Sequence, residues 1–188
     1  METNKSGYVV VEDFLTAEEA KTFYDAILNE CEPDAKPKFR YLHIANGVGT
    51  TDPVRKPWDP TNKLDAAVEY ARKHFSETYT ILGTLEFNRI FGNVMEEGSY
   101  LPSHRDEDAN MDGVFDGKKR SFVAGLFLND DYGDGELLFD DQDAALKPKP
   151  GTLVLFPGFY TNHGVNELTS GLRVNILIFF YDMVDMKP

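Results

Sequence analysis

Five short segments rich in β-branched and aromatic residues fill the second half of the chain, and they limit the possible folds more than any other feature. Gly, Asn, Asp or Pro residues separate them, a pattern that predicts strands joined by turns. The segments lie at residues 83–93, 119–130, 135–141, 151–158 and 171–182. No long strand–helix alternation connects them, which argues against a Rossmann-type parallel sheet. We therefore expect a β-sandwich or jelly roll over about residues 80–185.

The first 79 residues are expected to be mainly helical and to support this β-structure, which makes the chain α+β but mainly β. A short strand at Tyr8–Val11 precedes a helix over residues 17–30. Thr16 and Glu19 form a capping box at its start. A second helix is expected to begin at residue 61 or 62 and to reach residue 75, since its apolar residues recur at helical spacing.

The stretch between the two predicted helices, residues 39–60, is polar, aromatic and glycine-bearing, without an obvious periodic pattern. Connections of this length without secondary structure more often have a function than serve only to join two elements. Its candidate substrate contacts are Arg40, Tyr41 and Trp58. Two interpretations remain open, because these residues could cover a substrate as a lid or serve ordinary packing.

Composition describes one ordinary globular domain spanning residues 1–188, without repeats or a linker. The formal charge of −13 repels polyphosphate backbones and argues against a nucleic-acid partner. No apolar run is long enough to span a bilayer, so we expect no membrane association. Cys31 is the single cysteine, which excludes an internal disulfide and fits a cytoplasmic location.

The pattern that indicates chemistry is His104-Arg105-Asp106, followed 57 positions after Asp106 by His163 (163 − 106). Residues i and i+2 of a strand point to the same side, so His104 and Asp106 can reach one point, which His163 can approach from a neighbouring strand. Two imidazoles and one carboxylate leave open positions on an Fe(II) ion for a bidentate co-substrate and O₂. Structural zinc would need a fourth protein ligand. A lone His-x-Asp also arises by chance on a surface.

Arg173, ten residues after His163 in the last predicted strand, strengthens this interpretation. A buried guanidinium is a planar fork that pairs with a carboxylate through two hydrogen bonds. 2-Oxoglutarate, which chelates iron through its keto-acid end, needs such a partner for its far carboxylate. A structural ion pair would explain Arg173 alone, but the four positions together favour an oxygenase.

These residues, with the Gly-Asp-Gly-Glu-Leu, Pro-Gly-Thr and Leu-Phe-Pro motifs between them, occur in the order found in a known family. The chain resembles the Fe(II)/2-oxoglutarate dioxygenases, and specifically their prolyl 4-hydroxylase-like branch, over residues 84–183. The resemblance implies a double-stranded β-helix (jelly roll), iron held by His104, Asp106 and His163, and Arg173 binding 2-oxoglutarate. It also implies O₂ as the oxidant, ascorbate as a supporting reductant, and hydroxylation rather than halogenation.

The sequence departs from the family at two positions that often hold tyrosines binding 2-oxoglutarate. Phe91 and Phe127 stand there. Tyr100 or Asn88 is a candidate for the missing hydrogen bond, and Arg120 at the start of its strand is a further candidate substrate contact.

The resemblance favours hydroxylation of a prolyl or similar residue in a protein or peptide. Two other readings remain open: an oxygenase acting on a small molecule or nucleic acid, and a non-catalytic cupin-like module that binds metal without consuming 2-oxoglutarate.

Overall fold

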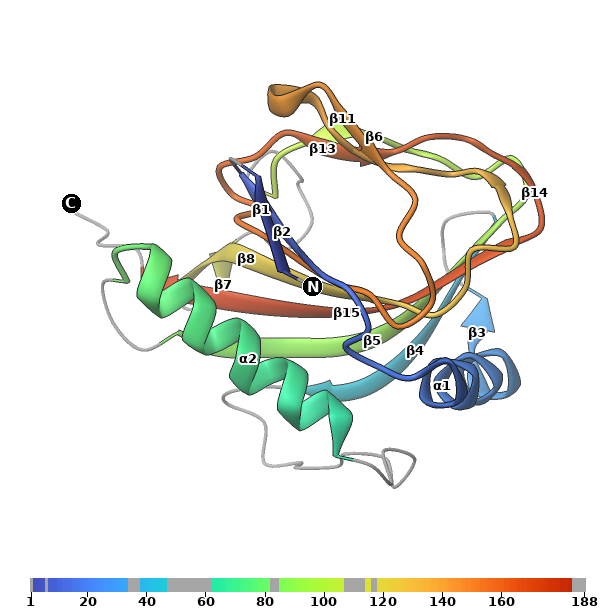
Figure 1. Ribbon diagram of the computed structural model, residues 1–188, viewed down its shortest axis with the longest axis horizontal. Coiled ribbons are helices and arrows are strands. Elements are labelled where there is room, and N and C mark those ends of the chain that lie inside the picture. Colours follow the sequence, from blue (N-terminus) through green and yellow to red (C-terminus); the bar gives the residue numbers. More distant parts are fainter. Residues whose placement is uncertain are drawn as a thin grey trace.

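Two antiparallel β-sheets face each other, and two helices cover the outside of the larger one (Figure 1). The computed structural model describes residues 2–5, 7–33, 38–46, 62–81, 85–106, 114–115 and 118–183. This arrangement confirms the expected double-stranded β-helix with supporting helices near the N-terminus. Both the major and the minor sheet join strands that lie far apart in the sequence.

The major sheet has nine strands in the order β1-β2-β12-β8-β15-β5-β4-β3, with β7 paired to β8 outside this path. All of its pairs are antiparallel. The strands are β1 (Glu2–Lys5), β2 (Tyr8–Val11), β3 (Glu32–Pro33), β4 (Phe39–Asn46), β5 (Glu86–Glu96), β7 (Val114–Phe115), β8 (Lys118–Phe127), β12 (Leu153–Phe156) and β15 (Leu172–Met183).

The minor sheet has four short strands in the order β11-β10-β13-β6, and β14 and β9 form a separate pair. A 3₁₀ turn at Asp140–Gln142 joins β10 to β11. The strands are β6 (Leu101–His104), β9 (Gly133–Asp134), β10 (Leu137–Phe139), β11 (Ala144–Leu146), β13 (His163–Val165) and β14 (Leu168–Ser170).

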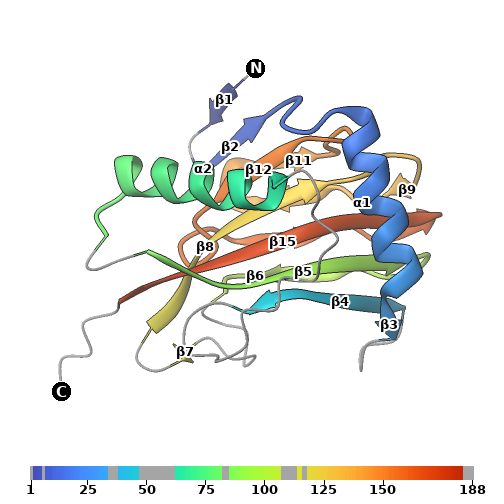
Figure 2. The same cartoon turned by 90° about the horizontal axis from the view of Figure 1, so that it is seen from below.

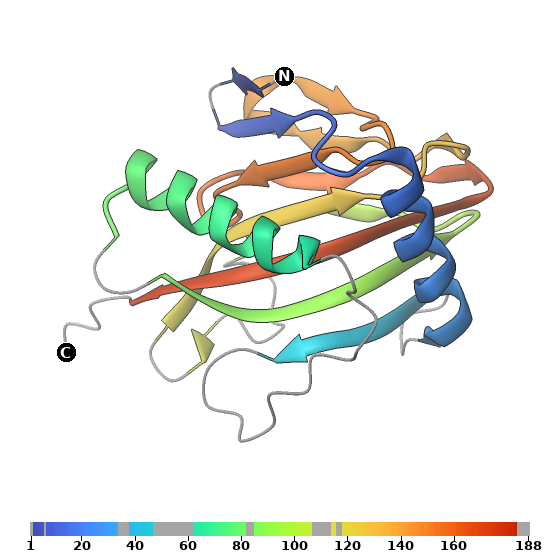
Figure 3. The same cartoon turned by 60° about the horizontal axis from the view of Figure 1, so that its bottom comes forward.

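Helices α1 (Ala17–Glu30) and α2 (Lys63–Thr78) lie on the outer face of the major sheet (Figures 2 and 3). Gly92 of β5 lets α1 approach, because a Cβ atom there would lie 2.8 Å from Cγ1 of Ile27. The predicted positions of both helices are confirmed, with small differences at their ends. In the described part of the chain, neither helix is long and apolar enough to cross a membrane.

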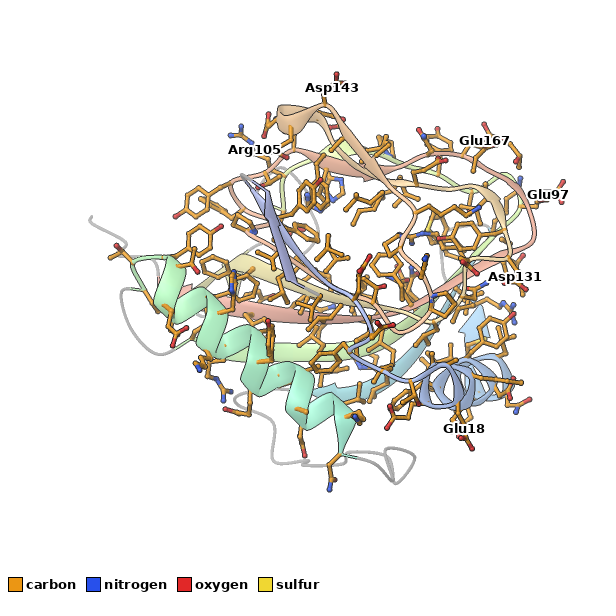
Figure 4. All side chains as sticks on the ribbon, viewed as in Figure 1. Glu18, Glu97, Arg105, Asp131, Asp143 and Glu167 are labelled. Atoms are coloured by element: carbon orange, nitrogen blue, oxygen red, sulfur yellow. The ribbon has the colours of Figure 1, made fainter. Side chains whose placement is uncertain are left out.

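Strand β15 separates two hydrophobic clusters, because successive side chains of a strand point to opposite faces. Val174, Ile176, Ile178 and Phe180 join an outer cluster between the major sheet and the helices. Leu177 and Phe179 face an inner cluster between the two sheets. Side chains fill this inner space, whereas the labelled acidic side chains of Glu18, Glu97, Asp131, Asp143 and Glu167 lie at the periphery (Figure 4).

One expectation about the stretch of residues 39–60 is wrong. Its first part is not an irregular connection, because Phe39–Asn46 forms β4, which pairs with β5. Leu42 and Ile44 are buried in the outer cluster, while Tyr41 lies against Phe91. The N-terminal part therefore contributes four strands to the major sheet as well as two helices. Residues 47–61 lie outside the described residues.

Candidate metal centre

His104, Asp106 and His163 lie together on the inner side of the minor sheet. Each offers one ligand atom, and these three atoms lie within 4.8 Å of one another. β6 ends at His104 and β13 begins at His163, and the two histidines are directly opposite each other in the sheet. Their ring centroids are 4.5 Å apart. The predicted convergence from neighbouring strands is therefore seen in the structure.

The predicted reason for the position of Asp106 needs correction. His104 and Asp106 do not share a strand, because β6 ends at His104 and Asp106 lies in the turn that follows. The backbone N–H of Asp106 donates to the carbonyl of Gly158, at 3.0 Å. A Cβ atom at residue 158 would lie 2.1 Å from Oδ2 of Asp106. The loop after β12, rather than strand alternation, therefore sets the carboxylate in place.

Backbone carbonyls orient both imidazoles. Nδ1 of His104 lies 2.9 Å from the carbonyl oxygen of Pro102, and Nδ1 of His163 lies 2.9 Å from that of Thr161. A carbonyl oxygen only accepts hydrogen bonds, so each Nδ1 carries the proton. Nε2 of each ring then carries the lone pair, which is the tautomer that binds a metal through Nε2.

The 3₁₀ turn at Asp140–Gln142 fixes the residue before each histidine. Ser103 donates its hydroxyl hydrogen to the carboxylate of Asp140. Asn162 donates its backbone N–H and its side-chain amide to Asp141, each at 3.0 Å. These two bonds hold the pKa of Asp141 below its ordinary value. One turn therefore connects β6 and β13 at the residues directly before the two histidines.

An aromatic wall covers one side of the metal centre. The ring of Phe156 lies edge-on to that of His163, with centroids 4.7 Å apart. Phe139 contacts Phe156 at 5.2 Å, and Tyr8 stacks on Phe139 at 4.4 Å. An apolar lining of this kind excludes water and strengthens electrostatic interactions inside the site.

Arg173 lies on the inner face of β15 and is 3% exposed. Its guanidinium carbon is 5.0 Å from the centre of the Phe127 ring, and Nη1 lies 3.5 Å from Sδ of Met95. Burial lowers the pKa of Arg173. Nε has no hydrogen-bond partner, and no carboxylate of the described residues forms an ion pair with this group. A buried, unpaired cation of this kind fits an anionic ligand.

Two buried polar features of the inner space were missed in the sequence. Asn93 and Asn175 lie opposite each other on β5 and β15, with Nδ2 of Asn93 donating to Oδ1 of Asn175 at 3.1 Å. Tyr132, in the connection between β8 and β9, is 4% exposed and interacts with Arg173. Neither stands in a recognisable motif, and burial of a polar residue is a tertiary property. The register of predicted strands could have indicated the asparagine pair.

The structure does not bring all predicted site residues to the metal centre. Tyr100 is 59% exposed, so it is not placed to give a buried hydrogen bond to a ligand of Arg173. Arg40 forms an ion pair with Glu96, with Nε and Oε1 2.9 Å apart, and Nη1 donates to Sγ of Cys31 at 3.3 Å. These contacts give Arg40 a structural role rather than the predicted substrate contact.

Tyr41 is the one tentative substrate residue that the described side chains place near the inner space. Its ring meets that of Phe91 edge-on at 5.4 Å, and Phe91 stacks on Phe179 at 5.3 Å. Trp58 lies outside the described residues. Asn88 and Arg120 belong to β5 and β8, but their side chains lie outside the described part of the structure. Their predicted roles stay predictions.

A family model described as the 2OG-Fe(II) oxygenase superfamily matches residues 88–181, which is half of the chain. Mouse prolyl 3-hydroxylase 2 is 36% identical over 67 residues, covering 32% of this chain and 10% of that protein. The chain therefore matches only a tenth of the length of this curated relative.

Solved structures of prolyl hydroxylases share the fold. The viral collagen prolyl hydroxylase of Paramecium bursaria Chlorella virus-1, in complex with 2-oxoglutarate, has a TM-score of 0.68 at 15% identity, over 94% of this chain and 97% of that one. A prolyl-4-hydroxylase of Pseudomonas putida has a TM-score of 0.66 at 17% identity, over 94% and 92%. At these identities the likeness concerns the fold.

Proposed function

Because the chain belongs to the 2OG-Fe(II) oxygenase superfamily, we propose that it hydroxylates a prolyl residue in a protein or peptide. Fe(II), 2-oxoglutarate and O₂ are the cofactor and co-substrates of such a dioxygenase. The observation that carries the proposal is the ligand cluster of His104, Asp106 and His163, which shares the inner space between the sheets with the buried cation of Arg173.

The donor set fits Fe(II). Two imidazole nitrogens and one carboxylate oxygen are the protein ligands of non-haem iron oxygenases, which keep the remaining positions for small ligands. Iron bound there would activate O₂, so that decarboxylation of 2-oxoglutarate to succinate accompanies hydroxylation of a C–H bond. The residues themselves orient the lone pairs, supply one negative charge and exclude water.

Arg173 fits the far carboxylate of 2-oxoglutarate. Its Nε has no protein partner, and the guanidinium fork can form two parallel hydrogen bonds to a carboxylate. The same fork cannot be replaced by the single ammonium of lysine without losing this geometry. Holding both ends of the co-substrate fixes its orientation before O₂ arrives.

Support for a prolyl substrate comes from the relatives, which are named as prolyl hydroxylases and share the fold. Tyr41, whose ring meets that of Phe91, is the described aromatic side chain that we assign to the substrate. The charge of −13 disfavours a nucleic-acid substrate, whose phosphates it repels.

The first test measures succinate formed from 2-oxoglutarate by the purified protein with Fe(II), ascorbate and air. His163→Ala and Arg173→Ala are expected to lose this turnover. His74→Ala in α2 is the matched control, because it removes a histidine outside the metal centre, and it should keep wild-type turnover. Turnover that persists in His163→Ala would contradict the proposed ligand set.

The second test offers proline-containing peptides and follows the gain of one oxygen atom at proline by mass spectrometry. Hydroxyproline formed with matching succinate supports the proposed substrate class. Succinate stimulated by a small molecule, but by no peptide, would assign the oxygenase to another substrate. A metal-loaded protein that fails to bind 2-oxoglutarate would instead be a non-catalytic binding module.

A further inference from the structure

The connection between β8 and β9 brings Tyr132 next to Arg173 in the interior. Gly171, two residues before Arg173, adopts φ +77°, and a Cβ atom there would lie 3.2 Å from Cα of Tyr132. The close approach of these backbones directs the tyrosine side chain inward, where it is 4% exposed. Neither the Tyr132 hydroxyl nor Nε of Arg173 has a well-formed hydrogen bond.

We propose that the Tyr132 hydroxyl donates a hydrogen bond to the far carboxylate of 2-oxoglutarate, beside the guanidinium of Arg173. This inference rests on the proposed function and names a second residue for the co-substrate. Tyr132 would supply the hydroxyl that the sequence lacks at Phe91 and Phe127. The ring of Phe127 lies under Arg173 and offers no hydrogen bond there.

Electrostatics agree with a shared anionic ligand. Burial raises the pKa of Tyr132, and the nearby guanidinium partly offsets this rise. Burial also lowers the pKa of Arg173, an effect that Tyr132 opposes. At neutral pH the hydroxyl therefore keeps its proton and remains a donor. An Arg173 N–H can donate to the Tyr132 oxygen, but the guanidinium offers no acceptor for the Tyr132 O–H, since its N–H groups only donate. A carboxylate between the two groups would accept from both.

The position of Tyr132 is fixed from several sides. Lys147 donates to the carbonyl oxygen of Tyr132, and its ammonium lies 4.6 Å from the centre of the tyrosine ring. Gly135 leaves room on the other side, because a Cβ atom there would lie 3.3 Å from Cδ2 of Tyr132. A residue held this firmly before binding loses little freedom when a ligand arrives.

Asn129 holds the strand on both sides of Arg173. Its Nδ2 donates to the carbonyl of Leu172 at 2.7 Å, and its Oδ1 accepts from the backbone N–H of Val174 at 2.9 Å. The same Nδ2 also donates to Asp131, the residue before Tyr132, at 2.6 Å. One buried side chain therefore links the backbone on both sides of Arg173 to the carboxylate of the residue before Tyr132.

The test compares two ligands by calorimetry on the Ni(II)-loaded protein, which does not turn over. 2-Oxoglutarate carries the far carboxylate, whereas 2-oxopentanoate has a methyl group in its place. Tyr132→Phe is expected to raise the Kd of 2-oxoglutarate about 10-fold, since a hydrogen bond to a charged group is lost. The Kd of 2-oxopentanoate should change less than about twofold, which is small on the same scale.

Two control variants make the result specific. Tyr79→Phe removes a hydroxyl from a tyrosine packed against the outer cluster and should leave both Kd values unchanged. Arg173→Ala should weaken 2-oxoglutarate more than Tyr132→Phe does, again without a matching loss for 2-oxopentanoate. The melting temperature of each apo variant verifies that the fold is retained.

Each other outcome would overturn either the role of Tyr132 or the proposed function. An unchanged Kd for 2-oxoglutarate in Tyr132→Phe, with the expected loss in Arg173→Ala, would overturn the role of Tyr132 and leave the proposed function standing. Equal weakening of both ligands by Tyr132→Phe would show that the hydroxyl acts on the fold rather than on the carboxylate. A wild-type protein that binds neither ligand would overturn the proposed function together with this inference.

Discussion

Gly158 shows how closely the protein surrounds the carboxylate of the metal centre. Its backbone carbonyl accepts the N–H of Asp106, and a Cβ atom there would lie 2.1 Å from Oδ2 of Asp106 and 3.0 Å from Cγ2 of Val123. Real Cβ atoms do not approach other atoms so closely. The residue type at position 158 is thus set by the ligand beside it and not by a strained backbone angle.

Gly158→Ala is therefore expected to displace the Asp106 side chain and to weaken metal binding. We expect the Kd for Ni(II) to rise about 10- to 100-fold, as for loss of supporting contacts around metal ligands. Isothermal titration calorimetry on the apo protein measures this. Gly125→Ala on β8 is the control, because its Cβ would meet no atom closer than 3.3 Å. Equal affinity in both variants would contradict the tight fit.

From residue types and their order, the chemistry of the site could be predicted more accurately than its geometry. The two histidines, Asp106 and Arg173 were identified because few other functions need this set in this order. Two features depend on loops that pack against distant strands. They are the position of Asp106 in a turn and the inward direction of the Tyr132 side chain. A single sequence carries no periodic signal for such contacts.

At the scale of single elements, helix α1 begins with a capping box that the sequence predicted. The Thr16 side chain accepts from the backbone of Glu19 at 3.2 Å, and the Glu19 carboxylate accepts from the backbone of Thr16 at 2.9 Å. Glu19 also lies 3.4 Å from Nζ of Lys63 at the start of α2. The cap therefore joins the starts of the two helices.

Thr16→Ala should destabilise the protein by about 1 kcal/mol, because a helix N-terminus loses its side-chain acceptor. Thr22→Ala in the same helix is the matched control. The Thr22 hydroxyl bonds back to the carbonyl of Glu18, and alanine has the higher helix propensity, so this change should be neutral or stabilising. Urea denaturation of both variants gives the two free energies of unfolding. Equal losses would contradict a specific role of the cap.

The elements that sequence analysis missed are those with few residues or mixed polarity. Among the described side chains of β4, Leu42 and Ile44 are the ones buried on the helix side, and the polar stretch that follows hides this alternation. The minor-sheet strands β6 and β13 were expected only because their histidines should converge, and with four and three residues they are too short for a period to show. The longest strands, β5, β8 and β15, were recognised as strands because they are long and apolar.

For the whole molecule, the two faces of the major sheet have separate tasks. The outer cluster joins the sheet to the helices, and Phe75 of α2 stacks on Phe122 at 4.6 Å within it. The inner cluster surrounds the metal centre through Phe156 and Phe139. Pairing of strands far apart in sequence, such as β12 with β2, creates both faces, and local sequence patterns do not specify this pairing.

This division predicts that stability and metal affinity respond separately to mutation. Phe75→Ala should cost about 3–5 kcal/mol through the cavity it leaves, while the Kd for Ni(II) at low temperature stays unchanged. Phe156→Ala, the matched change on the inner face, should lower both stability and metal affinity, because its ring contacts His163. Denaturation of the apo proteins and calorimetry separate the two effects. A large loss of metal affinity in Phe75→Ala would contradict the division.

The direct pairing of His104 with His163 has a consequence for the life of the protein in a cell. A metal ion bound to both histidines would tie together two short strands of the minor sheet, which otherwise depend on a few backbone bonds and the Asp140–Gln142 turn. Any ligand that binds only the folded state stabilises it. Iron shortage would therefore destabilise the strands β6 and β13 first and expose them to proteases. We expect the abundance of this protein to follow the supply of its metal, so that a cell short of iron removes idle copies.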